Sequence, residues 1–61
     1  MFKKGQLVKT KRNGVGVIRR VSQKVKGRYL LSNPEWAFDM YFREPEIVEL
    51  IGNNFKFKGA K

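Results

Sequence analysis

The spacing of apolar and polar residues predicts short β-strands along most of the chain. Residues 6–11 alternate in character, and residues 15–22 form a run rich in β-branched side chains. The Asn-Gly pair at 13–14 lies between them and is typical of a tight hairpin turn. Gly16 lies inside the second run, where a glycine indicates a bulge or a close approach of another segment. We therefore expect the first two strands to form a hairpin.

The centre of the chain predicts a loop, a short strand and a turn. Residues 23–27 are polar and basic and end in glycine, which indicates a loop. Residues 29–31 are apolar enough for a short strand, and residues 32–35 contain the Asn-Pro pair of a turn.

The segment after this turn allows two interpretations. Trp36, Phe38, Met40 and Phe42 alternate with smaller or polar residues, which predicts a strand with its large apolar residues on one face. We expect Phe38 and Phe42 in the core and Trp36 in the core or half-exposed. The same segment also resembles a helix over residues 34–43 that begins after an asparagine cap. We favour the strand, because a small protein has little core to cover a helix on all sides.

The end of the chain predicts a turn, a strand and a tail. Residues 43–46 break the pattern around Pro45 and are expected to form a 3₁₀ turn. Residues 47–51 form the last predicted strand. The basic segment 52–61 is expected to be a mobile tail, since small and polar residues separate it from the rest. The prediction is one barrel domain over residues 1–51 and a tail over residues 52–61.

Charge is distributed very unevenly along the sequence. The net charge is +9 in 61 residues, and the first thirty residues carry ten cations and no acid. All five acids lie between Glu35 and Glu49. Self-repulsion within the basic half disfavours compaction, so a partner of opposite charge is indicated. A solvated surface that protects strand edges is the simpler explanation, but it does not account for so long a run of one sign.

Composition argues against several classes of function. The chain has no cysteine and no histidine, which removes disulfides, thiolate metal sites and the commonest general base. No nucleophile and base combination stands out, so we expect no enzyme activity and no cofactor. No apolar run approaches the roughly 20 residues of a membrane span, and residues 1–5 lack the apolar stretch of a signal peptide. We expect a cytoplasmic protein, or one in the host cytoplasm if it is viral.

The pattern resembles an SH3-like barrel of the KOW and Tudor type. Residues 5–9 resemble the opening strand of such barrels, residues 13–18 their glycine-punctuated second strand, and residues 43–50 their short turn and closing strand. The resemblance covers roughly residues 5–51. It implies an all-β fold: a small five-stranded antiparallel barrel with a short 3₁₀ turn before the last strand. Such barrels occur in ribosomal proteins, transcription factors, archaeal chromatin proteins and small bacteriophage proteins.

The same resemblance implies where the cations lie. In such a barrel the last strand pairs near the first, which would bring Glu46 and Glu49 close to Lys9 or Lys11. We expect one of Arg19 and Arg20 to serve a basic surface and the other a rim or an ion pair. The candidate nucleic-acid-binding residues are Lys9, Lys11, Arg12, Arg19, Arg20, Lys24, Lys26, Arg28 and Tyr29. Tyr29 would stack on a base, or else pack its ring in the barrel.

Two functions compete on these grounds. The first is a nucleic-acid-binding protein that contacts phosphates with little sequence preference. DNA is favoured over RNA, and double-stranded DNA is the first choice. The second is a protein-interaction or inhibitor module that docks on an acidic surface of a larger machine such as a polymerase. Membrane association is not expected, because the chain offers no basic amphipathic helix.

Overall fold

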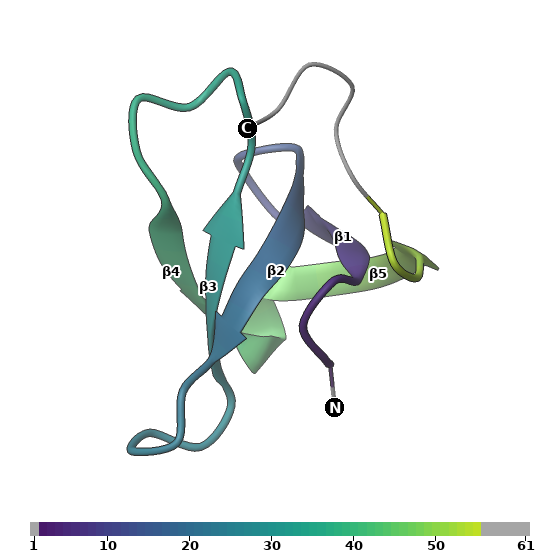
Figure 1. The fold of residues 1–61 in the computed structure, drawn as a ribbon. Coiled ribbons are helices and arrows are strands. Elements are labelled where there is room, and N and C mark those ends of the chain that lie inside the picture. The colour runs from purple at the N-terminus through teal and green to yellow at the C-terminus, as the bar shows by residue number, and fades with distance from the viewer. Residues whose placement is uncertain (1, 56–61) are drawn as a thin grey trace.

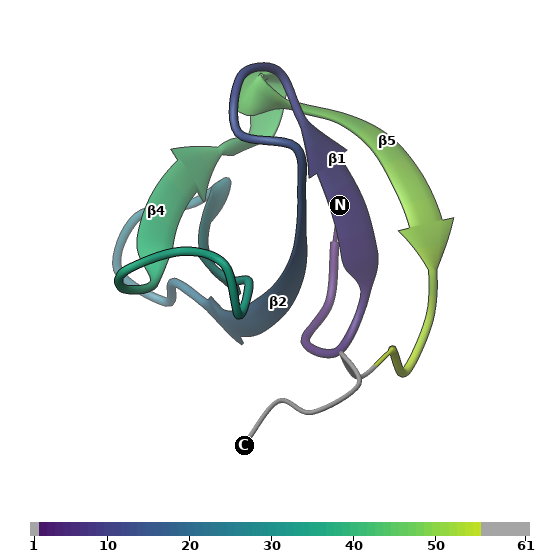
Figure 2. The same cartoon turned by 90° about the horizontal axis from the view of Figure 1, so that it is seen from above.

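Five antiparallel strands form one strongly curved sheet in the computed structural model, which describes residues 2–55 (Figure 1). The sheet order is β4-β3-β2-β1-β5, and the two edge strands are joined through one 3₁₀ turn, so the sheet curls around a common interior (Figure 2). The all-β class and the turn before the last strand are confirmed. In the described part, no helix is long and apolar enough to cross a membrane. The elements are β1 Leu7–Thr10, β2 Val15–Val21, β3 Arg28–Ser32, β4 Met40–Arg43, η1 Glu44–Glu46 and β5 Ile47–Gly52.

The core lies on the inner face of the curved sheet. Each strand contributes to it at alternate positions, as period-two side-chain geometry requires. Phe42 is in this core, as the sequence predicts. Because few side chains are buried in this core, the truncation of any one of them should lower the stability of the whole domain. The cluster consists of Val8, Ile18, Tyr29, Leu31, Phe42 and Ile47, with Phe2, Val21, Trp36 and Met40 packed against it.

The first hairpin forms as predicted, although its turn is longer than an Asn-Gly pair. β1 ends at Thr10 and β2 begins at Val15. Gly14 has a φ of 75°. Asn13 does not have a positive φ, because Asn54 is the only described non-glycine residue that does. A two-residue type I′ turn needs positive φ at both central positions, so this turn is of another kind. The buried Thr10 hydroxyl closes it by donating to the Gly14 carbonyl, 2.7 Å away.

Gly16 is where a loop approaches β2 closely. A Cβ atom there would lie 2.8 Å from Trp36 Cη2 and 3.3 Å from Leu31 Cβ. Trp36 is half-buried and packs against Phe42, with ring centroids 5.9 Å apart. The close approach expected at Gly16 is therefore confirmed, and the indole ring is what approaches.

The strand predicted within residues 34–43 is confirmed only for the end of the segment, and the helix interpretation is wrong. Strand β4 begins only at Met40, and the residues before it form turns and bends. The Asn33 side chain explains why: its Oδ1 accepts from Glu35 N–H, and its backbone carbonyl accepts from Trp36 N–H. These bonds make a tight turn rather than a helix cap. Phe38 is 73% exposed and is not a core residue, because it lies in this loop.

Tyr29 connects the core, Phe2 near the N-terminus and the turn residue Glu44. Its ring is 1% exposed, and its hydroxyl donates to Glu44 Oε1 at 2.9 Å and accepts from Phe2 N–H at 3.2 Å. The Phe2 ring meets it edge-on, with centroids 5.5 Å apart. Burial, together with the hydrogen bond to Glu44, raises the pKa of Tyr29 above its ordinary value of 10.0.

The predicted tail falls mostly outside the described residues. Gly52 still belongs to β5, and Phe55 N–H donates to the Gly5 carbonyl at 2.9 Å. The mobile basic tail was predicted over residues 52–61, and its last part, residues 56–61, lies outside the described residues.

We predict that Gly16→Ala destabilises the protein by about 1 to 3 kcal/mol, the usual cost of overpacking. The new methyl group would overlap the Trp36 ring. Urea unfolding followed by tryptophan fluorescence measures the change. Gly52→Ala is the matched control, because it is also a strand glycine without positive φ and has open space around its Cβ position. Equal effects of both substitutions would contradict the proposed contact.

We predict that Tyr29→Phe lowers the free energy of unfolding by about 2 kcal/mol, since it removes a buried donor to a carboxylate. Tyr41→Phe, which removes an exposed hydroxyl, should have little effect. The folded-state pKa of Tyr29 is raised, so its contribution is complete below pH 10 and is lost as the pH rises through that pKa. The stability difference between the protein and Tyr29→Phe should therefore shrink above about pH 10. A difference that stays constant with pH would contradict this assignment.

Candidate nucleic-acid interface

A bulge in β2 separates the roles of its two adjacent arginines. Ile18 pairs with Leu31 and Arg20 pairs with Leu30, so Arg19 is the extra residue. Arg19 Nη1 contacts Asp39 Oδ2 at 3.3 Å. Arg20 is exposed on the outer face, opposite Leu30. The expectation that one arginine makes an ion pair is confirmed, and that arginine is Arg19.

The pairing of β3 with β4 places two further arginines together. Arg28 and Arg43 are direct cross-strand partners, and both are exposed. Side chains at such positions have Cβ atoms about 5 Å apart, and like charges there are unfavourable. The sheet therefore holds two cations side by side at the end of β4 at some cost to stability.

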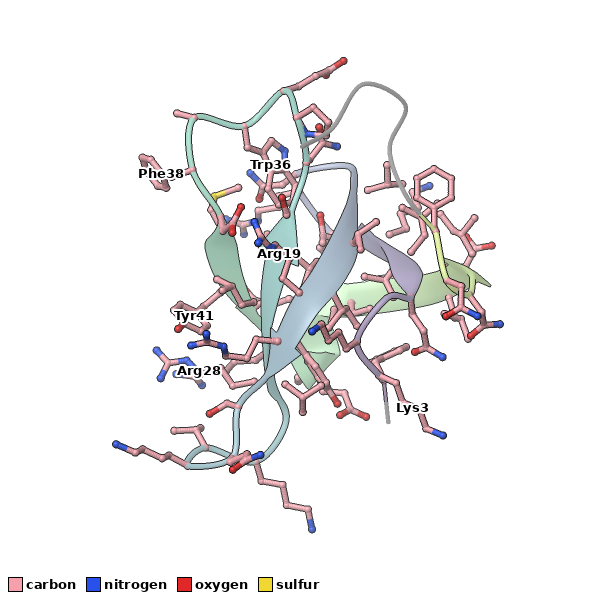
Figure 3. The ribbon with its side chains drawn as sticks, in the orientation of Figure 1. Lys3, Arg19, Arg28, Trp36, Phe38 and Tyr41 are labelled. Carbon is pink, nitrogen blue, oxygen red and sulfur yellow. The ribbon has the colours of Figure 1, made fainter. Side chains whose placement is uncertain are left out.

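Tyr41 completes this surface. The guanidinium carbon of Arg28 lies 4.7 Å from the centroid of the Tyr41 ring, a cation–π contact. The two side chains lie next to each other beside β4, and Lys3 lies on the far side of the molecule (Figure 3). We call the outer surface of β2, β3 and β4 with the adjoining loop the arginine face. Its members are Arg20, Lys24, Arg28, Tyr41 and Arg43.

The loop between β2 and β3 extends the arginine face. Ser22 N–H donates to the Arg28 carbonyl at 2.9 Å, and the Ser22 hydroxyl accepts from Val25 N–H at 3.0 Å. Lys24 and Lys26 are exposed on this loop. A shallow groove of about 610 Å³ runs along the loop and is lined by Arg20, Lys24, Arg28 and Tyr41 among others. A second groove of about 410 Å³ also has Arg28 in its lining, together with Lys26, Arg43 and Glu44 among others.

The cationic side chains of the arginine face make no ion pair among the described residues. Among the described residues, no ion pair within 4.0 Å joins a side-chain nitrogen of these four cations (Arg20, Lys24, Arg28 and Arg43) to a carboxylate. The nearby acids lie differently: Glu46 Oε1 accepts from the Arg43 backbone N–H at 2.9 Å, and Glu44 lines the smaller groove beside Arg28 and Arg43. The charge of the four cations is consequently available to an external anion. A cluster of uncompensated cations beside low-dielectric protein concentrates positive potential.

Three of the predicted residues lie elsewhere. Lys11 and Arg12 are exposed in the turn between β1 and β2, at the opposite end of β2 from Lys24. Lys9 is exposed on β1 and pairs across the strands with Glu49. Lys11 N–H donates to the Glu46 carbonyl at 2.9 Å. The predicted proximity of the first and last strands is confirmed, and these three cations are separate from the arginine face.

Tyr29 faces the core, so its ring offers no surface for a base to stack on. Tyr29 was a candidate because it follows Arg28 directly in the sequence. Arg43, which stands among the acids in the sequence, and Tyr41 are not among the predicted site residues. The alternation of residues 40–43 could have found both, because Met40 and Phe42 turn inward and leave Tyr41 and Arg43 on the outer face.

The arginine face is suited to binding anions. In the described part of the chain, no group of three or more histidine, cysteine, aspartate or glutamate residues is placed to hold a metal ion. Arginine offers a planar set of donors that matches phosphate, and lysine offers a compact charge. Comparison of the chain with protein-family models, with curated proteins and with solved structures finds no match.

Proposed function

We propose that this chain is a non-enzymatic nucleic-acid-binding module that contacts the phosphate backbone through the arginine face. One observation carries the proposal. Arg28 and Arg43 are held directly opposite each other, with Arg20 and Lys24 nearby, and none of these four side chains forms an ion pair with a carboxylate of the described residues. A polyanion would relieve this repulsion and would release counterions on binding. Contacts of this kind do not read sequence, so we expect little sequence preference, with DNA favoured over RNA.

We also propose which type of small barrel the chain forms. A five-stranded antiparallel sheet that curls on itself, with a 3₁₀ turn before the last strand, supports an SH3-like barrel of the KOW and Tudor type. The chain would then be a small prokaryotic or bacteriophage protein that acts in the cytoplasm. The arrangement of charge on the surface, rather than the fold, supports the binding function.

A second candidate function is protein interaction, and β5 favours it. β5 is an edge strand, and Val48, Leu50 and Ile51 on it are each about half exposed. Glu49 lies in the same strand, so this edge combines apolar and acidic character on the side of the sheet opposite to β4. Exposed edges of this kind can pair with another chain. An acidic protein surface could in turn meet the arginine face.

The proposed function predicts how DNA affinity depends on salt concentration. If four cations of the arginine face each meet a phosphate, the logarithm of the affinity for a DNA duplex should fall with the logarithm of salt concentration with a slope of about −4. Fluorescence anisotropy of a labelled duplex and a matching RNA between 50 and 200 mM salt (about a fourfold range) measures the slope. Absence of binding to either at the lowest salt would refute the proposal.

The second prediction concerns location. Arg28→Gln combined with Arg43→Gln should reduce the slope by about 2 and weaken binding at least tenfold, because two phosphate contacts are lost. Lys3→Gln combined with Lys4→Gln removes the same formal charge from two exposed lysines outside the arginine face, and it should cost much less. Thermal unfolding of both variants checks that the fold is intact. Equal losses would mean that net charge alone drives binding.

The second candidate has its own test. A pull-down from nuclease-treated lysate should retain one specific protein on the wild-type chain and lose it when Val48 and Ile51 are replaced by lysine. Both side chains are exposed, so the substitutions should leave the core intact. If no protein is retained after nuclease treatment, β5 has no partner in that lysate and this candidate fails there.

A further inference from the structure

Tyr41 is a feature of the arginine face that phosphate binding does not require. Its ring is 53% exposed on the outer face of β4 and lines the larger groove with Arg20, Lys24 and Arg28. Its hydroxyl makes no hydrogen bond with any described residue, and the contact that holds the ring is the Arg28 guanidinium, whose carbon lies 4.7 Å from the ring centroid. An aromatic ring of this size at a cationic surface offers an apolar contact that a purely ionic site would not need.

The strand register places the Tyr41 ring in one row across the sheet with the apolar Leu30 and the cationic Arg20. Arg20 on β2 pairs with Leu30 on β3, and Leu30 pairs with Tyr41 on β4. Neighbouring strands are about 4.8 Å apart, so these three side chains span roughly 10 Å across the sheet. Leu30 is half-buried between the other two. A flat apolar group that lies over Leu30 would contact Tyr41 on one side and have Arg20 on the other.

A second row of cations flanks the first. Arg28 and Arg43 lie two residues further along β3 and β4, which corresponds to about 7 Å along the strands. Arg28 also lines both grooves and holds its guanidinium against the Tyr41 ring. The aromatic contact and the cationic contacts are thus close enough for successive parts of one nucleotide chain.

Strandedness decides whether such a ring can be used. Every nucleobase has a π-face that stacks on an aromatic side chain, and each such stack contributes about 1 to 3 kcal/mol. In a duplex these faces are covered by the neighbouring base pairs, so a ring on a sheet surface cannot reach them without unstacking the helix. In a single strand the faces are accessible.

We propose that the nucleic acid bound by the arginine face is single-stranded, with an unpaired base packed against Tyr41 over Leu30 and the flanking phosphates on Arg20, Arg28 and Arg43. This inference rests on the function proposed above and names the ligand class of the same surface. It replaces the expectation drawn from the sequence, which favoured duplex DNA. Tyr41 provides the preference for bases, and the cations provide the affinity for phosphates.

The experiment uses three oligonucleotides of equal length and one salt concentration. These are a labelled 12-mer of thymidine, the same 12-mer built from abasic sites, and a 12-base-pair duplex. Anisotropy titration of the full chain should give an affinity for the thymidine strand at least fivefold higher than for the abasic strand, and higher than for the duplex. Tyr41→Leu should abolish the difference between the thymidine and abasic strands, and Tyr41→Phe should keep it.

Each outcome of this experiment separates the inference from the proposed function. Binding to all three with equal affinity, or tighter binding to the duplex, overturns the inference and leaves phosphate binding in place. Equal weakening of the thymidine and abasic strands by Tyr41→Leu means that the ring only positions Arg28, and this also overturns the inference. Absence of binding to any of the three overturns the proposed function itself. Thermal unfolding of both Tyr41 variants confirms that they are folded.

Discussion

The pairing register of β2, β3 and β4 is the constraint on which both the core and the arginine face depend. Because successive side chains in a strand point to opposite faces, a slip of one residue would exchange the core with the outer surface. The bulge at Arg19 adjusts β2 so that Ile18 and Val21 both face the core while Arg20 faces out. Without it, strict alternation would place Ile18 and Arg20 on the same face.

The same register converts a linear distribution of charge into two different surfaces. Glu49 comes to lie opposite Lys9 across β1 and β5, so part of the basic half is offset by the acidic segment. On the other side of the sheet, Arg28 lies opposite Arg43, and neither side chain forms an ion pair with a carboxylate of the described residues. The fold therefore concentrates uncompensated charge at β2 to β4 and leaves the edge strand β5 apolar and acidic.

The sequence predicts the strands well where local signals agree with the tertiary structure. The β-branched run of β2, the glycine turn before it and the proline turn before β5 all have one strong local preference. The segment before β4 was mispredicted because alternation of large apolar residues counts only when a neighbouring strand is present. Asn33 directs the backbone into a turn by local hydrogen bonds, and the Phe38 side chain is left in solvent.

The site was only partly predictable for a related reason. Charge counts along a chain cannot show which cations become neighbours, since that depends on cross-strand pairing. Arg43 stands among acids in sequence and beside Arg28 in space, whereas Tyr29 stands beside Arg28 in sequence and points into the core. Local sequence therefore found the basic loop at Lys24 and Lys26 and missed the aromatic and cationic pair on β4.

The claim that the arginine face is the contact surface is tested most directly by an amide NMR titration of the full chain with a short oligonucleotide. Chemical shift changes should gather at residues 20–28 and at residues 41–43, and the signals of β5 and of the turn at Lys11 and Arg12 should stay largely unchanged. Changes concentrated on β5 or on that turn, or spread evenly over all lysines and arginines, would contradict it.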